Sequence, residues 1–271
     1  MSLKRIFTPV LLASAILVAP GAADQIQSPP NAQETARFAA VPFGPGEHMS
    51  YKISLGILGK VGNGSIEVAE LDTLFSRPVY KLRMLIKGKK LMAEVNDDYQ
   101  SWFDAERLLS LRFYQNIHEV NYKRLRTLDF DLAAGKWRRL EKEEEGPLAS
   151  REPLDDLSFL YFVRTLPLEV GKEYTFNRYF KEDGNPVRIR VLRRETITVP
   201  AGKFNTIVVQ PIIQTTGLFG EGGKAEVFFT DDEARIPVQI KSKVKLIGSL
   251  NMELQSYTPG TRLGPLTRAS R

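Results

Sequence analysis

The segment IPVQIKSKVKLIGSLNMEL, residues 236–254, decides the fold of this chain. Eight of its apolar side chains fall on even positions, while lysines and other polar side chains fall on odd ones. The apolar set is Ile236, Val238, Ile240, Val244, Leu246, Leu250, Met252 and Leu254. Successive side chains of a strand point to opposite faces of a sheet, so the pattern predicts two strands joined by a short turn, each with one dry face.

The same alternation recurs over residues 51–57, 80–87, 109–118 and 187–191. One polar face per strand indicates an antiparallel sheet with a solvated side, because strands of a parallel sheet are buried on both faces. About a dozen such strands are too many for one flat sheet. The fold class is therefore mainly β, and we expect a curled antiparallel sheet that is barrel-like or an open clam.

One segment, PLDDLSFLYFVRT over residues 153–165, breaks the two-residue alternation. Its leading proline suits a first helical turn, and Asp155 and Asp156 oppose the positive end of a helix dipole. Pro167 then ends the helical run. The segment is apolar on nearly all sides, so it predicts one buried helix that plugs or covers the curled sheet.

Composition excludes several classes of function. The chain of 271 residues has no cysteine and only two histidines, His48 and His118, so we expect no metal and no cofactor. The acid pairs Asp97-Asp98, Asp155-Asp156 and Asp231-Asp232 are explained by strand, helix-end and turn positions. We find no catalytic constellation and expect no enzyme. The net charge of +6 is spread along the chain, so we expect no nucleic-acid partner.

The N-terminal residues predict export. Lys4 and Arg5 precede the apolar stretch 6–18, and small residues up to Ala23 suit a cleavage site. This is a signal peptide over 1–23, too short for a comfortable membrane span, although a retained anchor is the alternative. We expect a flexible leader at 24–42, one β-rich domain at 43–257 and a disordered basic tail at 258–271. The mature protein is then periplasmic, without a transmembrane span.

Three stretches resemble one known family. They are GEHMSYKI at 46–53, DLSFLYFVRTLPLEVG at 156–171 and ETITVPAGKFNT at 195–206, the last followed by residues 231–240. In this order they are similar to the exported bacterial family of domain of unknown function 3108, over about residues 43–256. The resemblance implies an exported β-rich domain. It brings no established catalytic residues.

Two glycine-rich turns are candidate ligand-binding tips. Ile57 and Leu58 lie between Gly56 and Gly59, and Leu218 and Phe219 lie between Gly217 and Gly220. Each pair presents two apolar side chains at a predicted hairpin tip, and the two turns also hint at an internal echo. The four side chains could flank the mouth of an apolar interior and touch a lipid or a partner.

Arg193 and Glu195 are the remaining candidates. If residues 187–199 kept one alternation, both side chains would face the dry interior with Val191 and Ile197. A buried charge has to pair or bind a ligand. The two side chains could pair with each other, while a bulge near Leu192 would turn both to solvent, which is the interpretation that we favour.

These patterns favour a non-enzymatic binding or carrier module for an apolar or amphiphilic ligand, since apolar sheet face is abundant. The alternative is a structural or assembly partner that docks on an envelope protein or polysaccharide. The possible partners are therefore a lipid, a glycan or an envelope protein. An enzyme acting on envelope glycans is a third hypothesis, and it would need Asp97, Asp98 or His48.

Overall fold

The computed structural model describes residues 39–90, 93–119, 122–213, 225–244 and 248–263. The strands are β1 (His48–Leu55), β2 (Gly59–Leu74), β3 (Arg77–Lys90), β4 (Ala93–Asp104), β5 (Ser110–Glu119), β6 (Tyr122–Asp131), β7 (Lys136–Arg139), β8 (Glu144–Pro147), β9 (Glu173–Phe176), β10 (Val187–Val199), β11 (Gly202–Ile212), β12 (Ala225–Thr230), β13 (Pro237–Val244) and β14 (Gly248–Thr258). The helices are η1 (Gly56–Leu58), α2 (Asp156–Val163) and η2 (Glu182–Gly184). None of these helices is long and apolar enough to cross a membrane.

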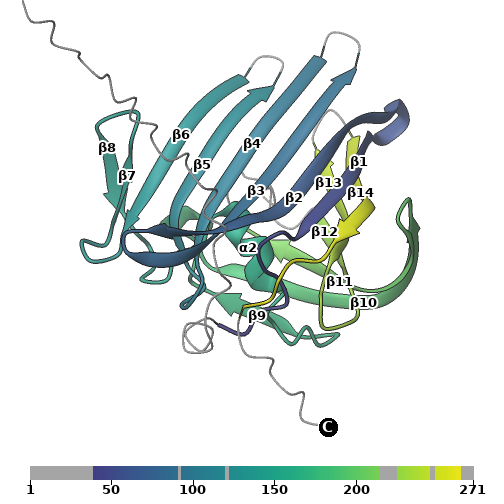
Figure 1. The fold of residues 1–271 in the computed structure, drawn as a ribbon. Coiled ribbons are helices and arrows are strands. Elements are labelled where there is room, and N and C mark those ends of the chain that lie inside the picture. Colours follow the sequence, from purple (N-terminus) through teal and green to yellow (C-terminus); the bar gives the residue numbers. More distant parts are fainter. Residues whose placement is uncertain (1–38, 91–92, 120–121, 214–224, 245–247, 264–271) are drawn as a thin grey trace, which may run out of the picture.

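All fourteen strands form one antiparallel sheet in the order β8-β7-β6-β5-β4-β3-β2-β1-β14-β13-β12-β11-β10-β9. The chain enters at the centre with β1, builds outward to β8, crosses through α2 to the other edge at β9, and returns to pair β14 with β1. The edge strands β8 and β9 do not pair with each other, so the curl stays open (Figure 1). The predicted fold class is confirmed in its open form.

The deciding segment forms β13 and β14, paired with Ile240 opposite Met252. Both of these side chains are at most 4% exposed, and they belong to the main hydrophobic core. The outer face of the sheet carries cross-strand ion pairs. Arg83 binds both oxygens of Asp98 at 3.0 and 2.9 Å, for example. One buried face and one charged face are what the alternation predicts.

Helix α2 lies between two parts of the curled sheet. It packs on β3 and β4 on one side, and on its other side it faces β11 and β12 (Figure 1). All eight of its residues are buried. The predicted helix over 153–165 is confirmed in place, although it is shorter, because Asp155 is the extended N-cap residue and Pro153 precedes it.

Ordered packing extends past both expected limits of the domain, residues 43 and 257. The Ala39 amide donates to the Ala105 carbonyl at 2.9 Å, and Val41 is buried. At the other end the Thr261 amide donates to the Pro45 carbonyl at 2.9 Å, and Leu263 is buried. The predicted signal peptide lies outside the described residues, as does most of the predicted tail.

Candidate functional site

The predicted hairpin tips are described only in part. Ile57 and Leu58 lie in η1, at the turn between β1 and β2, and the Leu58 side chain is 45% exposed. Only the backbone of Ile57 is described. Leu218 and Phe219 lie outside the described residues, so their position relative to η1 stays a prediction.

A bulge displaces Arg193 and Glu195 from the helix-facing side of the sheet. Val191 pairs with Val209, whereas Arg193 pairs with Val208, so Leu192 is the extra residue. Directly paired residues share a face, and Val209 faces the helix, so Arg193 faces away from it. A single alternation from 187 to 199 is therefore wrong, and the bulge near Leu192 is present.

Both charged side chains are partly exposed and paired on this outer face. Arg193 Nε lies 2.8 Å from Glu195 Oε2, and its NH2 group lies 3.1 Å from Glu226 Oε2. The side chains of Arg193 and Glu195 are 43% and 39% exposed. Pairs as exposed as these contribute little to stability, and neither side chain reaches the interior.

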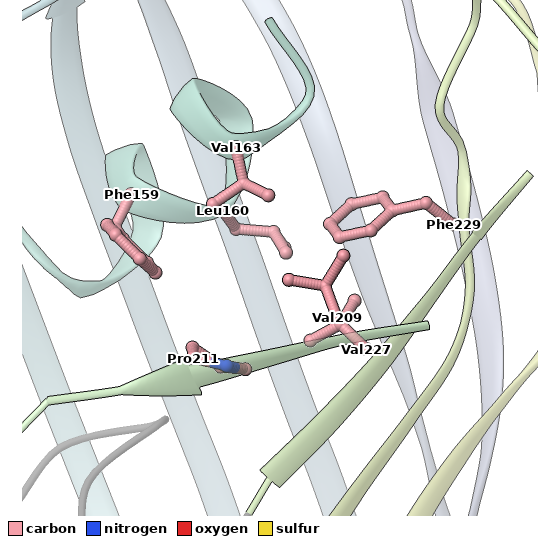
Figure 2. Close-up of a pocket in the computed structure, with 7 residues that line it drawn as sticks. All are labelled: Phe159, Leu160, Val163, Val209, Pro211, Val227 and Phe229. Carbon is pink, nitrogen blue, oxygen red and sulfur yellow. The ribbon is translucent and has the colours of Figure 1, made fainter. Parts of the chain in front are cut away.

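The interior site is an apolar pocket between helix α2 and the paired strands β11 and β12 (Figure 2). Its volume is about 10 Å³, which is about the space of one water molecule. The lining is entirely hydrophobic and consists of Phe159, Leu160, Val163, Val209, Pro211, Val227 and Phe229. Such a surface can hold an apolar group and offers no side chain for acid–base or nucleophilic chemistry.

The helix wall of the pocket leads to a polar cluster. Asp156 precedes Leu160 by four residues and Val163 by seven, so the three lie along one face of α2. The Asp156 carboxylate accepts a hydrogen bond from the Tyr179 hydroxyl at 3.2 Å. Arg126 adds an opposite charge to this environment and donates to Gln115 Oε1 at 2.5 Å. The Arg126 Nε atom is buried and has no hydrogen-bond partner in the described part of the chain.

Two carboxyl groups, those of Asp156 on α2 and Asp97 on β4, are buried on the side of the sheet that holds the helix. Burial raises the pKa of Asp156 to about 6, the negative charge of Asp155 adds to the shift, and Arg126 opposes it. Burial also raises the pKa of Asp97 to about 6, although the His118 amide donates to Asp97 Oδ1 at 3.0 Å. Tyr99, near both carboxyl groups, has a raised pKa for the same reason. The cluster therefore combines charged and neutral polar groups beside an apolar pocket.

The N-terminal end of α2 is fixed by a capping box. Asp155 Oδ1 accepts from the amides of Leu157 and Ser158, both at 2.9 Å, and the Ser158 hydroxyl accepts from the Asp155 amide at 2.9 Å. The Ser101 hydroxyl of β4 donates to Asp155 Oδ2 at 2.6 Å. These bonds satisfy the free amides of the first turn and tie it to the sheet, which positions Asp156.

A buried ion pair fixes the other end of α2. Arg164 donates to the two carboxylate oxygens of Glu47 at 2.6 and 2.8 Å, and to the Ala234 carbonyl at 2.9 Å. The two side chains are 1% and 0% exposed. The arginine thus joins the helix to the start of β1 and to the β12–β13 turn. Sequence reasoning missed this pair, because its members are 117 residues apart.

The structure also places the residues considered for metal or acid chemistry. His48 lies at the start of β1, 3.8 Å from Glu67, and Glu47 beside it is engaged by Arg164. Asp97 and Asp98 are neighbours on a strand and point to opposite faces. Across the described ranges, no group of three or more His, Cys, Asp or Glu side chains is placed to hold a metal ion.

An open, curled antiparallel sheet with a helix inside and an apolar pocket defines the class of this protein. The chain belongs to the family described as protein of unknown function DUF3108, whose sequence profile matches residues 50–255. The resemblance seen in the sequence is confirmed. No curated protein matches the sequence.

A solved structure supports the fold. A Brucella abortus protein described as a beta-barrel-like protein of domain of unknown function DUF1849 is 11% identical. Its TM-score is 0.53, and the match covers 79% of this chain and 97% of the other. At this identity the likeness concerns the fold alone.

Two further structures are more distant in shape. A "putative lipoprotein" from Parabacteroides distasonis has a TM-score of 0.36 at 11% identity, with 81% of this chain and 99% of the other covered. A "putative exported protein with YmcC-like fold" from Bacteroides fragilis has a TM-score of 0.30 at 11% identity, with 81% and 100% covered.

Proposed function

We propose that this protein is an exported, non-enzymatic module that binds one apolar or amphiphilic molecule between helix α2 and strands β11 and β12. The proposal rests on the pocket itself, because all seven side chains that line it are hydrophobic. Apolar surface left facing a space rather than packed loses the contacts that close packing gives. An apolar ligand would restore them.

The size of the pocket and its surroundings indicate the kind of ligand. A volume of about 10 Å³ is far below the roughly 300–1,000 Å³ of sites for complete drug-sized molecules. The pocket therefore marks where part of a molecule, such as a segment of an acyl chain, would enter as the lining side chains of α2, β11 and β12 move apart. Asp156 and Tyr179, reached along the helix face, would meet a polar part of the same ligand.

Export is part of the proposal and rests on the N-terminal sequence. Lys4 and Arg5, the apolar run 6–18 and the small residues before Asp24 form a signal peptide, which would deliver the protein to the periplasm. An envelope lipid is then an available ligand. Sequencing the N-terminus of the protein recovered from the cell tests cleavage near Ala23.

A pocket-filling substitution tests the binding role. Val227→Phe adds a ring to the pocket wall and should reduce the affinity for an apolar fluorescent probe such as N-phenyl-1-naphthylamine. Val170→Phe makes the same change at a side chain that is 43% exposed and should leave probe affinity unchanged. Near-UV circular dichroism identifies any variant that loses its tertiary packing, and Val163→Ile is the gentler filling variant. Equal probe affinity in all folded proteins would count against the pocket.

A docking role is the second candidate. It is favoured by the filled interior, since α2 is buried on all sides and the pocket is small. In this case the apolar space would be a packing defect, and the surface would carry the function. Crosslinking in cells separates the two roles. A protein partner captured equally by the Val227→Phe variant and the original chain would favour docking.

A further inference from the structure

One end of the sheet carries a concentration of positive charge. In an antiparallel sheet alternate turns lie at the same end, so the β1–β2, β3–β4, β5–β6 and β13–β14 turns share one end (Figure 1). We call these hairpin ends the basic rim, and it comprises residues 56–60, 87–90, 93–96, 118–119, 122–125, 241–244 and 248–250. These residues include eight Lys and Arg and only two Glu, Glu94 and Glu119.

The opposite end has the reverse charge. Its β2–β3, β4–β5, β6–β7 and β12–β13 turns, residues 72–77, 104–107, 131–136 and 231–235, contain seven Asp and Glu and four Lys and Arg. The short β7–β8 hairpin, which carries Glu143 and Glu144, turns toward the same end as the basic rim but does not reach it. The Leu140 amide donates to the Thr127 carbonyl at 2.9 Å, so this hairpin turns level with the middle of β6. These two sets of hairpin ends therefore carry opposite net charges.

The basic side chains of the rim that the structure describes are available to an external partner. Lys60 and Lys123 are exposed, and neither forms an ion pair with any described residue. Lys89 lies 3.4 Å from Glu94, but their side chains are 72% and 66% exposed, so this pairing is weak. An anionic surface would meet most of these charges without first breaking a strong internal pair.

Exposed hydrophobic side chains lie among these charges. Leu58, Tyr122 and Leu125 are 45%, 40% and 51% exposed, and they are three of the six large hydrophobic side chains exposed in the described ranges. The Arg124 guanidinium lies 5.0 Å from the centre of the Tyr122 ring. Aliphatic and tyrosine side chains beside Lys and Arg are typical of the membrane interface, where the rings reach the headgroup level.

We propose that the basic rim docks on an anionic lipid bilayer, with Leu58, Tyr122 and Leu125 entering the headgroup region. Clustered lysines near an anionic membrane contribute additively to binding. Their attraction to the membrane surface falls off within a Debye length. A polysaccharide would use the charges but would not require the exposed aliphatic side chains. This inference is independent of the apolar pocket and of any ligand in it.

Vesicle co-sedimentation of the full chain tests the docking. The probes are phosphatidylcholine vesicles with and without phosphatidylglycerol, at low and high salt. Lys60→Glu with Lys123→Glu should weaken binding to the anionic vesicles about tenfold or more, since both charges are reversed at the surface. The matched control, Lys172→Glu with Lys203→Glu, makes the same charge change at exposed positions outside the basic rim. Residues 1–38 are identical in the original chain, the rim variant and the control variant, so any contribution of these residues to vesicle binding cancels in the comparison.

The inference is supported if the protein binds anionic vesicles in preference to neutral ones, if salt weakens this binding, and if only the rim variant loses it. Weaker vesicle binding by a Tyr122→Ser, Leu125→Ser variant at high salt also supports the inference. Equal binding to neutral and anionic vesicles, or equal losses in both lysine pairs, would overturn it. Binding to heparin without binding to vesicles would overturn it in favour of a glycan. Val227→Phe should leave vesicle binding unchanged, which separates a failure here from a failure of the pocket.

Discussion

Asp97 illustrates how burial changes the chemistry of a single side chain. The residue is 2% exposed, and burial raises the pKa of its carboxyl group to about 6. The folded protein therefore holds this proton more tightly than the unfolded chain does. Protonated Asp97 favours folding, and that contribution is lost as the pH rises from about 4 to about 6.

Asp97→Asn should raise the free energy of unfolding by about 1–3 kcal/mol at pH 7 and have little effect below about pH 4. The amide oxygen still accepts from the His118 amide, while the buried charge is removed. Urea unfolding at several pH values measures the difference. The control is Asp98→Asn on the opposite face, which should be destabilising because it weakens the pair with Arg83. A constant gain at all pH values for Asp97→Asn would contradict the burial argument.

The Glu47–Arg164 pair gives a second prediction. Arg164→Met leaves a carboxylate that is 0% exposed without its partner, so we expect a loss of about 3–5 kcal/mol in unfolding free energy. Combining it with Glu47→Gln should recover much of that loss, since no buried charge remains. Lys136→Met, which breaks a pair whose side chains are both 48% exposed, should cost at most about 1 kcal/mol. A loss in the double variant that equals the sum of the losses in Arg164→Met and Glu47→Gln would show that the charges do not interact.

The sequence predicts some of these residues better than others. The bulge at Leu192 is foreseeable, because Arg193 and Glu195 would otherwise be charges on a dry face. Nothing local connects Glu47 with Arg164, since only the curl of the sheet brings the start of β1 to the end of α2. Arg126 and Asp156 also lie in different elements, β6 and α2, and no local pattern connects them. Their hydrophilic character predicts exposure, whereas Asp156 is buried in the structure.

At the scale of elements, helix α2 depends on its first turn. Asp155→Ala removes the acceptor of three hydrogen bonds, from Leu157, Ser158 and Ser101, so we expect a loss of about 2–4 kcal/mol. Asp155→Asn keeps an oxygen at the cap and should cost less than half as much. Thermal unfolding of the two variants measures the contrast. Equal losses would mean that the carboxylate charge, rather than the cap geometry, holds the helix.

The long elements are predictable because their patterns are long. Strands β3 and β14 repeat the two-residue period many times, and α2 departs from it with an apolar surface on every side. The short strands β7, β8 and β9, of four residues each and at or next to the sheet edges, offer too few repeats to reveal a period. Their pairing is set by the neighbouring strand. Edge position also explains why polar residues and Pro147 are tolerated there.

At the scale of the whole molecule, strand number predicts curling but not closure. Fourteen strands could close into a barrel, yet the chain keeps β8 and β9 apart and passes the helical connection between them. The difference in charge between the two sets of hairpin ends also follows from the arrangement of the whole sheet. Lysines that look scattered in the sequence gather at one end, because alternate hairpins of an antiparallel sheet turn at that end. Neither feature can be read from one segment alone.

Mass spectrometry of molecules extracted from the purified, folded protein tests the central claim most directly. The measurement compares the original chain with Val227→Phe and Val170→Phe, recovered from the same cells. We predict that an amphiphile accompanies the original chain and Val170→Phe in near-equal amount to protein, and that Val227→Phe carries much less. Protein that is repeatedly recovered empty and takes up no envelope lipid when supplied would contradict the account.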